Sequence, residues 1–281
     1  MKIRLIALVL FCYLTAFTPG IITWTAIGDS ITYLNDHIDE TGNRITSGYM
    51  AKVAAQYPNI KYINQGHNGW TTVGIAKEIE NLGLIKTDVY SVLLGTNDWW
   101  TGLPLGSMKD YINNTGLKTS YGAYRIIINK IRNLNPNAKV ILITPMQRAD
   151  FVYIADAHNN AYGSYKPKNG QELSQFADAV KEIGNYEHFT VIDLYYKSGI
   201  TVNNVVKFKR LKDSVTGIYH NIKYPDYIGV PFHPGIDEYP YPMDAINYTY
   251  DGLHPSDKGH QLIADMIIDI FKKVGYIASD N

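Results

Sequence analysis

Short apolar runs alternate with amphipathic stretches along most of the chain, and this order constrains the fold more than any other feature. Five runs have the length and composition of strands, at Ile22–Ile27, Ile60–Asn64, Val89–Leu94, Lys139–Thr144 and Thr190–Leu194. Stretches with helical spacing lie at about Ser47–Gln56, Thr72–Leu82, Tyr121–Leu134, Gln171–Asn185 and Asp257–Val274. Repeated strand–helix units of this kind predict an α/β fold with a parallel sheet.

Two segments interrupt the alternation. Arg148–Gly170 is irregular, and Ser214–Tyr250 is a long connection that contains five prolines and seven tyrosines. Structureless loops of this length are usually functional or disordered. The tyrosines predict that the second segment is ordered, either as a wall of a binding site or as a loop held by its own aromatic side chains. Without repeats or linkers, residues 21–281 are expected to form a single domain.

The N-terminal residues resemble an export signal. A basic start, Met1–Arg4, precedes an apolar run of 13 residues, Leu5–Phe17, which is too short to span a bilayer but long enough for a signal-peptide core. We predict a signal peptide over residues 1–20 and a secreted or cell-surface protein; the alternative is that this segment forms a strand or helix of the fold. Cys12 is the single cysteine, so a processed chain would have neither a disulfide nor a cysteine nucleophile.

The charge balance gives no reason to expect nucleic acid or an anionic membrane as a partner. Lys and Arg number 26, and so do Asp and Glu. His67 and His233 lie near polar loops, but no second ligand stands at metal-binding spacing from either. We therefore predict no metal, no cofactor, no nucleic acid and no stable membrane insertion; the predicted partner is a small-molecule or polysaccharide substrate.

Four polar motifs follow strands or precede the last helix. Ligands bind beyond the carboxyl ends of parallel strands, so these motifs are the candidate site. They are Gly28-Asp29-Ser30, Asn64-x-Gly66-x-x-Gly69, Gly95-Thr96-Asn97-Asp98 and Asp251-x-x-His254-Pro255. Taken alone, each is explained as well or better by a helix cap or a turn. A carboxylate three residues before a histidine can nevertheless hold one imidazole nitrogen and leave the other free to act as a base.

The four motifs occur in chain order, and together they resemble the SGNH (GDSL-like) hydrolase family from about Ile22 to the C-terminus. The resemblance implies a flavodoxin-like three-layer α/β/α sandwich, here with a five-stranded parallel sheet, and metal-free ester hydrolysis. It also implies that Ser30 is the nucleophile, that His254 is its general base and that Asp251 orients His254. The oxyanion hole would consist of the Ser30 N–H, the Gly69 N–H and the Asn97 side chain.

Aromatic residues beside the motifs suggest where substrate binds. Trp70, Trp99 and Trp100 directly follow the expected oxyanion residues and are predicted to line the mouth of the pocket; the alternative for each is packing in the core. Asp29 and Tyr250, which adjoin the expected nucleophile and Asp251, are further candidate substrate-binding residues.

Together these features predict a secreted serine esterase that removes acetyl groups from a carbohydrate. Two alternatives stay open. The first is a lipid esterase, lysophospholipase or thioesterase, and the second is a non-catalytic carbohydrate-binding or surface module on the same fold.

Overall fold

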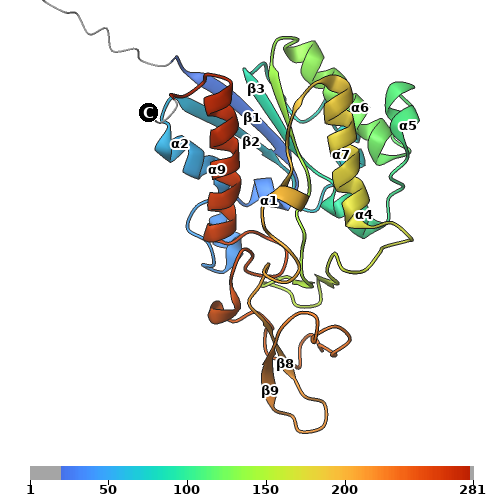
Figure 1. Ribbon diagram of the computed structural model, residues 1–281, viewed down its shortest axis with the longest axis vertical. Coiled ribbons are helices and arrows are strands. Elements are labelled where there is room, and N and C mark those ends of the chain that lie inside the picture. Colours follow the sequence, from blue (N-terminus) through green and yellow to red (C-terminus); the bar gives the residue numbers. More distant parts are fainter. Residues whose placement is uncertain (1–19, 279–281) are drawn as a thin grey trace, which may run out of the picture.

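The central sheet consists of five parallel strands in the order β2-β1-β3-β4-β7 (Figure 1). The strands are β1 (Ile22–Gly28), β2 (Ile60–Gly66), β3 (Val89–Leu93), β4 (Lys139–Ile143) and β7 (Thr190–Ile192). The computed structural model describes residues 20–278, so the predicted signal segment lies almost entirely outside the described residues. The parallel sheet and its five strands are confirmed. Counted among the parallel strands alone, the order is the flavodoxin-like 2-1-3-4-5, whose switch point lies between β1 and β3.

Helices cover both faces of the sheet, which confirms the three-layer arrangement (Figure 1). One face packs against α2 (Tyr49–Gln56) and α9 (Asp257–Lys273), and the other against α3 (Thr72–Lys77), α6 (Ser120–Leu134) and α7 (Leu173–Glu187). Alternate strand residues supply the two cores because side chains along a strand point to opposite faces. In β1, for example, Ala26 belongs to the first core and Ile27 to the second.

Short helices follow several strands at the carboxyl edge of the sheet. They are α1 (Ser30–Tyr33), α4 (Thr96–Thr101) and α8 (Leu194–Lys197), with 3₁₀ turns η1 (Ile38–Thr41) and η2 (Met243–Ala245). Helix α5 (Met108–Ile112) lies instead beside the C-terminal end of α7, where the Tyr111 hydroxyl donates to Glu187 at 2.6 Å. The longer helices begin and end within two residues of their predicted bounds, except that α3 ends at Lys77 and gives way to turns. The edge of the sheet is therefore built from tight turns, which place polar side chains near one another.

Two small antiparallel hairpins lie beyond this edge: one is within the first irregular segment, and the second irregular segment forms the other with the residues just before it. Within Arg148–Gly170, β5 (Phe151–Val152) pairs with β6 (Asn160–Ala161). Strand β8 (Lys209–Lys212) pairs with β9 (Tyr219–Ile222), and this hairpin projects from the lower end of the molecule in Figure 1.

The tyrosines of Ser214–Tyr250 fasten this segment to the rest of the fold. Tyr227, Tyr241 and Tyr250 are almost completely buried. The hydroxyl of Tyr241 donates to the Asp150 carbonyl, and that of Tyr239 donates to the Val152 carbonyl at 2.7 Å. The segment is thus ordered as expected, and its tyrosines stabilise it through burial and hydrogen bonds.

Candidate active site

The turn after β1 brings Ser30 to the carboxyl edge of the sheet. A Cβ at Gly28 would lie 2.1 Å from Thr32 Oγ1, so only glycine permits this turn. The side chain of Asp29 accepts a hydrogen bond from the Ile31 N–H at 3.0 Å and caps α1, so that Ser30 becomes the first helical residue.

Ser30, His254 and Asp251 form a hydrogen-bonded chain across the fold. His254 Nε2 lies 2.9 Å from Ser30 Oγ, and His254 Nδ1 lies 2.6 Å from Asp251 Oδ2. Because a carboxylate can only accept, Nδ1 carries the imidazole proton and Nε2 is free to accept from the serine hydroxyl. Asp251 is completely buried, and its Oδ1 accepts the N–H groups of Leu253 and His254 at 3.0 and 2.7 Å. Both carboxylate oxygens are therefore fixed before any substrate binds.

Three hydrogen-bond donors converge beside Ser30. Among residues 20–278, the N–H groups of Ser30 and Gly69 donate to no protein acceptor. Asn97 Nδ2 donates to the Trp70 carbonyl at 3.0 Å, which fixes the amide and leaves its second hydrogen unused. Gly69 has a φ of +76°, a backbone conformation that favours glycine. Ser30, Gly69 and Asn97 line the same pocket, so this set can stabilise a developing oxyanion.

Asp98, the last residue of the Gly95-Thr96-Asn97-Asp98 motif, joins three helices beneath this set. Its buried carboxylate accepts hydrogen bonds from the Thr72 N–H, the Thr72 hydroxyl and the Ser120 hydroxyl. Burial raises the pKa of Asp98, whereas these hydrogen bonds lower it. Because α3, α4 and α6 meet at this carboxylate, Asp98 holds the neighbouring Asn97 in place. The position of Asp98 directly after Asn97 was the signal for this role in the sequence.

Trp100 lines the pocket with Ser30, as predicted, but the other proposed substrate contacts are placed elsewhere. Trp99 is fully buried among Leu173 and Phe176, and its Nε1 donates to the Gln171 carbonyl at 3.0 Å, so its assignment to the pocket mouth is wrong. The partly buried Trp70 ring stacks on His67 with centroids 4.4 Å apart and does not line the pocket.

Asp29 and Tyr250 also lie in the interior rather than at the substrate surface. Their residues are 2% and 1% exposed, and neither lines the pocket. Asp29 is the helix cap described above, and burial raises its pKa to about 6. The Tyr250 ring stacks on His254 with centroids 5.9 Å apart, so this residue supports the imidazole from behind.

Residues of the first irregular segment complete the pocket. Arg148 and the two long inserts match none of the four motifs and were expected to determine the choice of substrate. The pocket has a volume of about 190 Å³, and Arg148, Phe151 and Ala161 close it opposite the serine. Backbone hydrogen bonds join this segment to residues 251–254, the catalytic loop. The Ala149 N–H donates to the Gly252 carbonyl at 2.9 Å, and the Val152 N–H donates to the Asp251 carbonyl at 3.1 Å.

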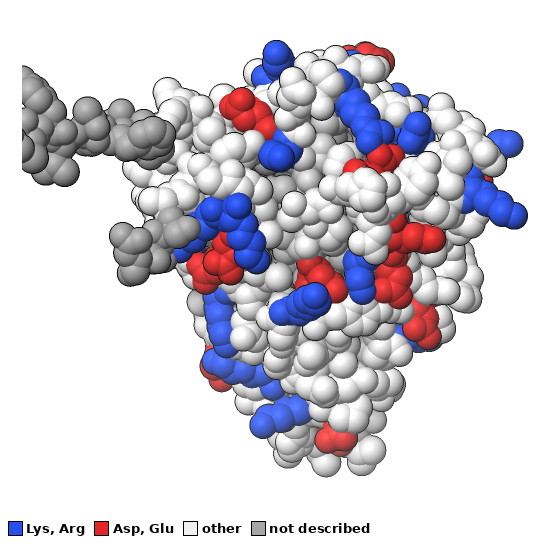
Figure 2. Space-filling model, turned by 45° about the horizontal axis from the view of Figure 1, so that its top comes forward, with Lys and Arg blue, Asp and Glu red and all other residues white. Residues whose placement is uncertain are grey.

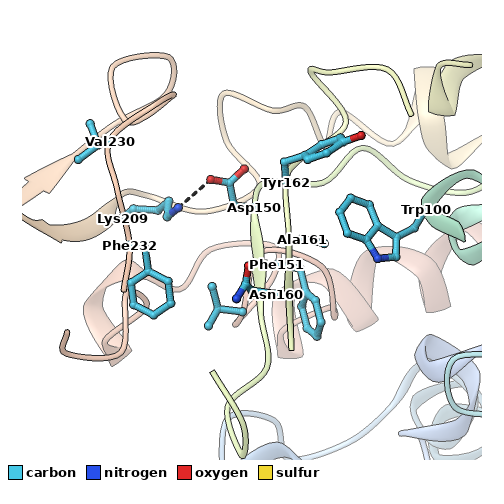
Figure 3. Close-up of a pocket in the computed structure, with 10 residues that line it drawn as sticks. Trp100, Asp150, Phe151, Asn160, Ala161, Tyr162, Lys209, Val230 and Phe232 are labelled. Carbon is cyan, nitrogen blue, oxygen red and sulfur yellow. Dashed lines mark hydrogen bonds and ion pairs between the residues drawn. The ribbon is translucent and has the colours of Figure 1, made fainter. Parts of the chain in front are cut away.

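A second pocket of about 300 Å³ adjoins the first and shares Trp100, Phe151 and Ala161 with it. Figure 3 shows Trp100 and Tyr162 on one side of this pocket and Lys209, Val230 and Phe232 on the other. Ser214–Tyr250 therefore reaches the pocket through Val230 and Phe232, and the expectation that its tyrosines form the wall is wrong.

On the face in Figure 2, basic side chains lie interspersed with acidic ones. Across residues 20–278, no group of three or more His, Cys, Asp or Glu side chains is placed to hold a metal ion. No helix in the described part of the chain is both long and apolar enough to cross a membrane.

A family model and several solved structures match this chain. A model of the GDSL-like lipase/acylhydrolase family matches residues 26–262. A solved structure described as a possible lipase from Chitinophaga pinensis has 60% sequence identity and a TM-score of 0.90, over 91% of this chain and 100% of that chain. No curated protein matches.

More distant solved structures share the fold. A protein from Lactobacillus plantarum has 19% identity and a TM-score of 0.59, over 90% of this chain and 98% of that chain. A catalytic mutant of an acetylxylan esterase from Geobacillus stearothermophilus has 19% identity and a TM-score of 0.50, over 94% of this chain and 99% of that chain.

Proposed function

Because the chain belongs to the GDSL-like lipase/acylhydrolase family and is an ester hydrolase, we propose that it removes acetyl groups from a carbohydrate through an acyl-enzyme on Ser30. The single observation that supports an acyl-enzyme on Ser30 is the continuous hydrogen-bonded chain from Ser30 through His254 to Asp251.

Acyl transfer follows from the protonation states of this chain. Ser30 Oγ attacks the ester carbonyl while its proton passes to His254 Nε2, 2.9 Å away. Asp251 stabilises the imidazolium that forms and keeps the ring in the required orientation. His254 then returns the proton to the departing alcohol oxygen. In the second half of the reaction, His254 takes a proton from water, whose oxygen attacks the acyl carbon. His254 then gives this proton to Ser30 Oγ as the bond between Oγ and the acyl carbon breaks and the acid is released.

The negative charge of each tetrahedral intermediate falls on the former carbonyl oxygen. The Ser30 N–H, the Gly69 N–H and the Asn97 amide stabilise this oxygen. Two of these donors are backbone groups and the third is fixed by the Trp70 carbonyl, so little reorganisation is needed when the charge develops.

The dimensions of the two pockets support a short acyl group and a larger alcohol. The pocket of about 190 Å³ at Ser30 is closed by Phe151, whose ring meets that of His254 edge-on at 5.3 Å. The adjoining pocket of about 300 Å³ is lined by the aromatic residues Trp100, Tyr162 and Phe232, a composition that suits the apolar surface of a sugar ring.

The test is hydrolysis of 4-nitrophenyl esters of increasing acyl length, followed by acetate release from acetylated polysaccharides. We expect activity to fall beyond the acetyl ester and to be lost in Ser30→Ala. The exposed Ser214→Ala variant, in the turn between β8 and β9, is the matched control. Undiminished turnover by Ser30→Ala would overturn the assignment.

The same experiment separates the alternatives. A rate that rises with acyl length would favour a lipid esterase or thioesterase. Sugar binding without covalent labelling of Ser30 by an organophosphonate would favour a non-catalytic binding module.

We also propose that residues 1–20 direct export, on the basis of their basic start and short apolar run. Mass spectrometry of the protein recovered from a secreting host would test this: a new terminus near Ile21 is expected, and an intact N-terminus would contradict it.

A further inference from the structure

Arg148 is a buried cation in the wall of the catalytic pocket. The residue is 1% exposed and lines the pocket together with Ser30 and His254. Its guanidinium makes one hydrogen bond within residues 20–278, from Nη2 to the Tyr162 carbonyl at 3.0 Å. Nε has no hydrogen-bond partner, and no carboxylate oxygen of the described chain lies within 4.0 Å of the group. A planar group with five donors therefore uses only one of them.

A second buried cation in the adjoining pocket shows how this protein otherwise neutralises such a charge. Lys209 is 3% exposed, and its Nζ lies 2.7 Å from Asp150 Oδ2 (Figure 3). The other oxygen of Asp150 accepts the Tyr165 hydroxyl at 2.6 Å and the Gly163 N–H at 2.9 Å. Asp150 is thus fully committed, and Arg148 has no comparable partner.

The environment of Arg148 offsets only part of the cost of its burial. Its Cζ lies 5.3 Å from the ring centre of Trp99 and 5.4 Å from that of Trp100, within the range of cation–π attraction. Buried charges in proteins are otherwise paired, because an unpaired one loses its hydration without replacement. Burial lowers the pKa of Arg148 to about 10 although the charges of Asp150 and Asp251, which lie beyond ion-pair distance, raise it, so the side chain is still cationic at neutral pH. The unused donors consequently suit an anion that arrives with the substrate.

Two more cations surround the same aromatic wall. Lys168 Nζ lies 4.2 Å from the ring centre of Trp100, and Lys166 Nζ lies 4.9 Å from that of Tyr162. Neither lysine forms an ion pair with a carboxylate in the described part of the chain. Both lysines therefore lie beside rings that line the adjoining pocket, which is proposed to receive the alcohol. Arg148 itself lines only the pocket at Ser30, but its guanidinium contacts Trp100, which both pockets share, and the Tyr162 carbonyl, so it lies where the two pockets meet.

We propose that Arg148 binds a carboxylate carried by the alcohol part of the ester, so that the substrate is an acetylated acidic sugar. A guanidinium presents paired N–H groups that match a carboxylate. Lys166 and Lys168 would attract the same charge from outside. This inference rests on the proposed function and adds a substrate class to it.

The test compares 4-acetoxybenzoate with 4-acetoxybenzamide, two acetyl esters that differ in the charge of the leaving group. Wild type should prefer the carboxylate. In Arg148→Gln, the ratio of the two kcat/KM values should fall by roughly 10- to 100-fold, as expected for a lost hydrogen bond to a charged group. Arg210→Gln is the matched control, because it removes an equal charge from the next residue after Lys209, where Arg210 pairs with Glu238 at 3.0 Å outside both pockets. An unchanged ratio in a folded Arg148→Gln would overturn the inference.

Further experiments allow for a misfolded Arg148→Gln variant and test whether the bound carboxylate belongs to the acyl group instead of the alcohol. If Arg148→Gln does not fold, Arg148→Lys should show an intermediate ratio. On wild type, 4-hydroxybenzoate should inhibit more strongly than 4-hydroxybenzamide, and equal inhibition would overturn the proposal. 4-Nitrophenyl succinate carries its carboxylate on the acyl side, and 4-nitrophenyl butyrate is the uncharged comparison. If Arg148 causes a preference for the succinate ester but none for 4-acetoxybenzoate over 4-acetoxybenzamide, the proposal that the carboxylate belongs to the alcohol would be overturned.

Failure of the two proposals is distinguishable. Hydrolysis of 4-acetoxybenzamide that Ser30→Ala abolishes supports the esterase function whatever the ratio. If wild type hydrolyses neither acetoxy ester, the esterase function fails, and the binding of 4-hydroxybenzoate to the Ser30→Ala protein, measured by calorimetry, then tests Arg148 alone.

Discussion

Acidification should destabilise the protein through His260, a buried histidine in α9, the helix that follows the catalytic loop. The residue is 1% exposed, its ring stacks on Tyr49 with centroids 6.2 Å apart, and its Nδ1 has no hydrogen-bond partner. Burial lowers its pKa from 6.5 to about 3, so the folded protein keeps the ring neutral at pH 5. The unfolded chain takes up a proton on the same ring below about pH 6.5.

The sign and size of the effect follow from this difference in proton binding. Where the unfolded state binds more protons, stability falls as the pH falls. His260 therefore contributes no penalty above about pH 7, and an increasing penalty between about pH 6.5 and pH 3. At pH 5, which is about 1.5 units below the ordinary histidine pKa, the penalty is about 2 kcal/mol.

Urea denaturation at pH 7 and pH 5, followed by tryptophan fluorescence, measures the penalty. The loss of unfolding free energy between the two pH values should be about 2 kcal/mol smaller in His260→Leu than in wild type. Substitution of the exposed His220 by leucine, on β9, is the matched control and should leave the pH dependence unchanged. If His260→Leu lost as much stability as wild type on acidification, the buried neutral state of His260 would be refuted.

Four further outcomes are expected. Asn97→Ala should lower kcat by about 10²–10³, because one of three oxyanion donors is lost, and a normal kcat would exclude that role. Asp29→Asn keeps the helix cap but removes a carboxyl whose pKa burial raises to about 6; since that carboxyl costs stability as the pH rises through 4 to 6, denaturation above pH 7 should show a gain of up to about 3 kcal/mol. Thr72→Val removes the hydroxyl that donates to Asp98, and a shift of the helix would also break the hydrogen bond from the residue 72 N–H to Asp98. The melting temperature should fall by the equivalent of about 1–3 kcal/mol. Gly252→Ala places a Cβ 1.9 Å from the Asp150 carbonyl at a φ of +91°, so both thermal stability and esterase rate should fall.

The framework of the fold was predictable because its strands and long helices carry strong local patterns. Apolar runs bounded by polar turns gave five strands within two residues of their observed ends, and the four motifs came together at the carboxyl edge of the sheet. Chain order and strand ends are local information, which a sequence displays directly.

The pocket walls were not predictable because long-range contacts decide them. Trp99 and Trp100 are adjacent in a six-residue helix, and only the packing of α7 determines that Trp99 enters the core while Trp100 lines the pocket. The strands of the β5–β6 hairpin have two residues each, too few to show a period. Arg148 carries no motif, and its position depends on Tyr162 and the two tryptophans.

The hydrogen bonds that join Ala149 to Gly252 and Val152 to Asp251 have a consequence for redesign. These backbone hydrogen bonds join residues 148–163, which line the pocket, to the loop that carries Asp251 and His254, so neither segment can be exchanged between related enzymes without the other. A chimera that transplants residues 148–163 alone would disturb these hydrogen bonds and displace Asp251. Grafting that segment together with residues 239–254 as one cassette should transfer selectivity with the catalytic geometry intact.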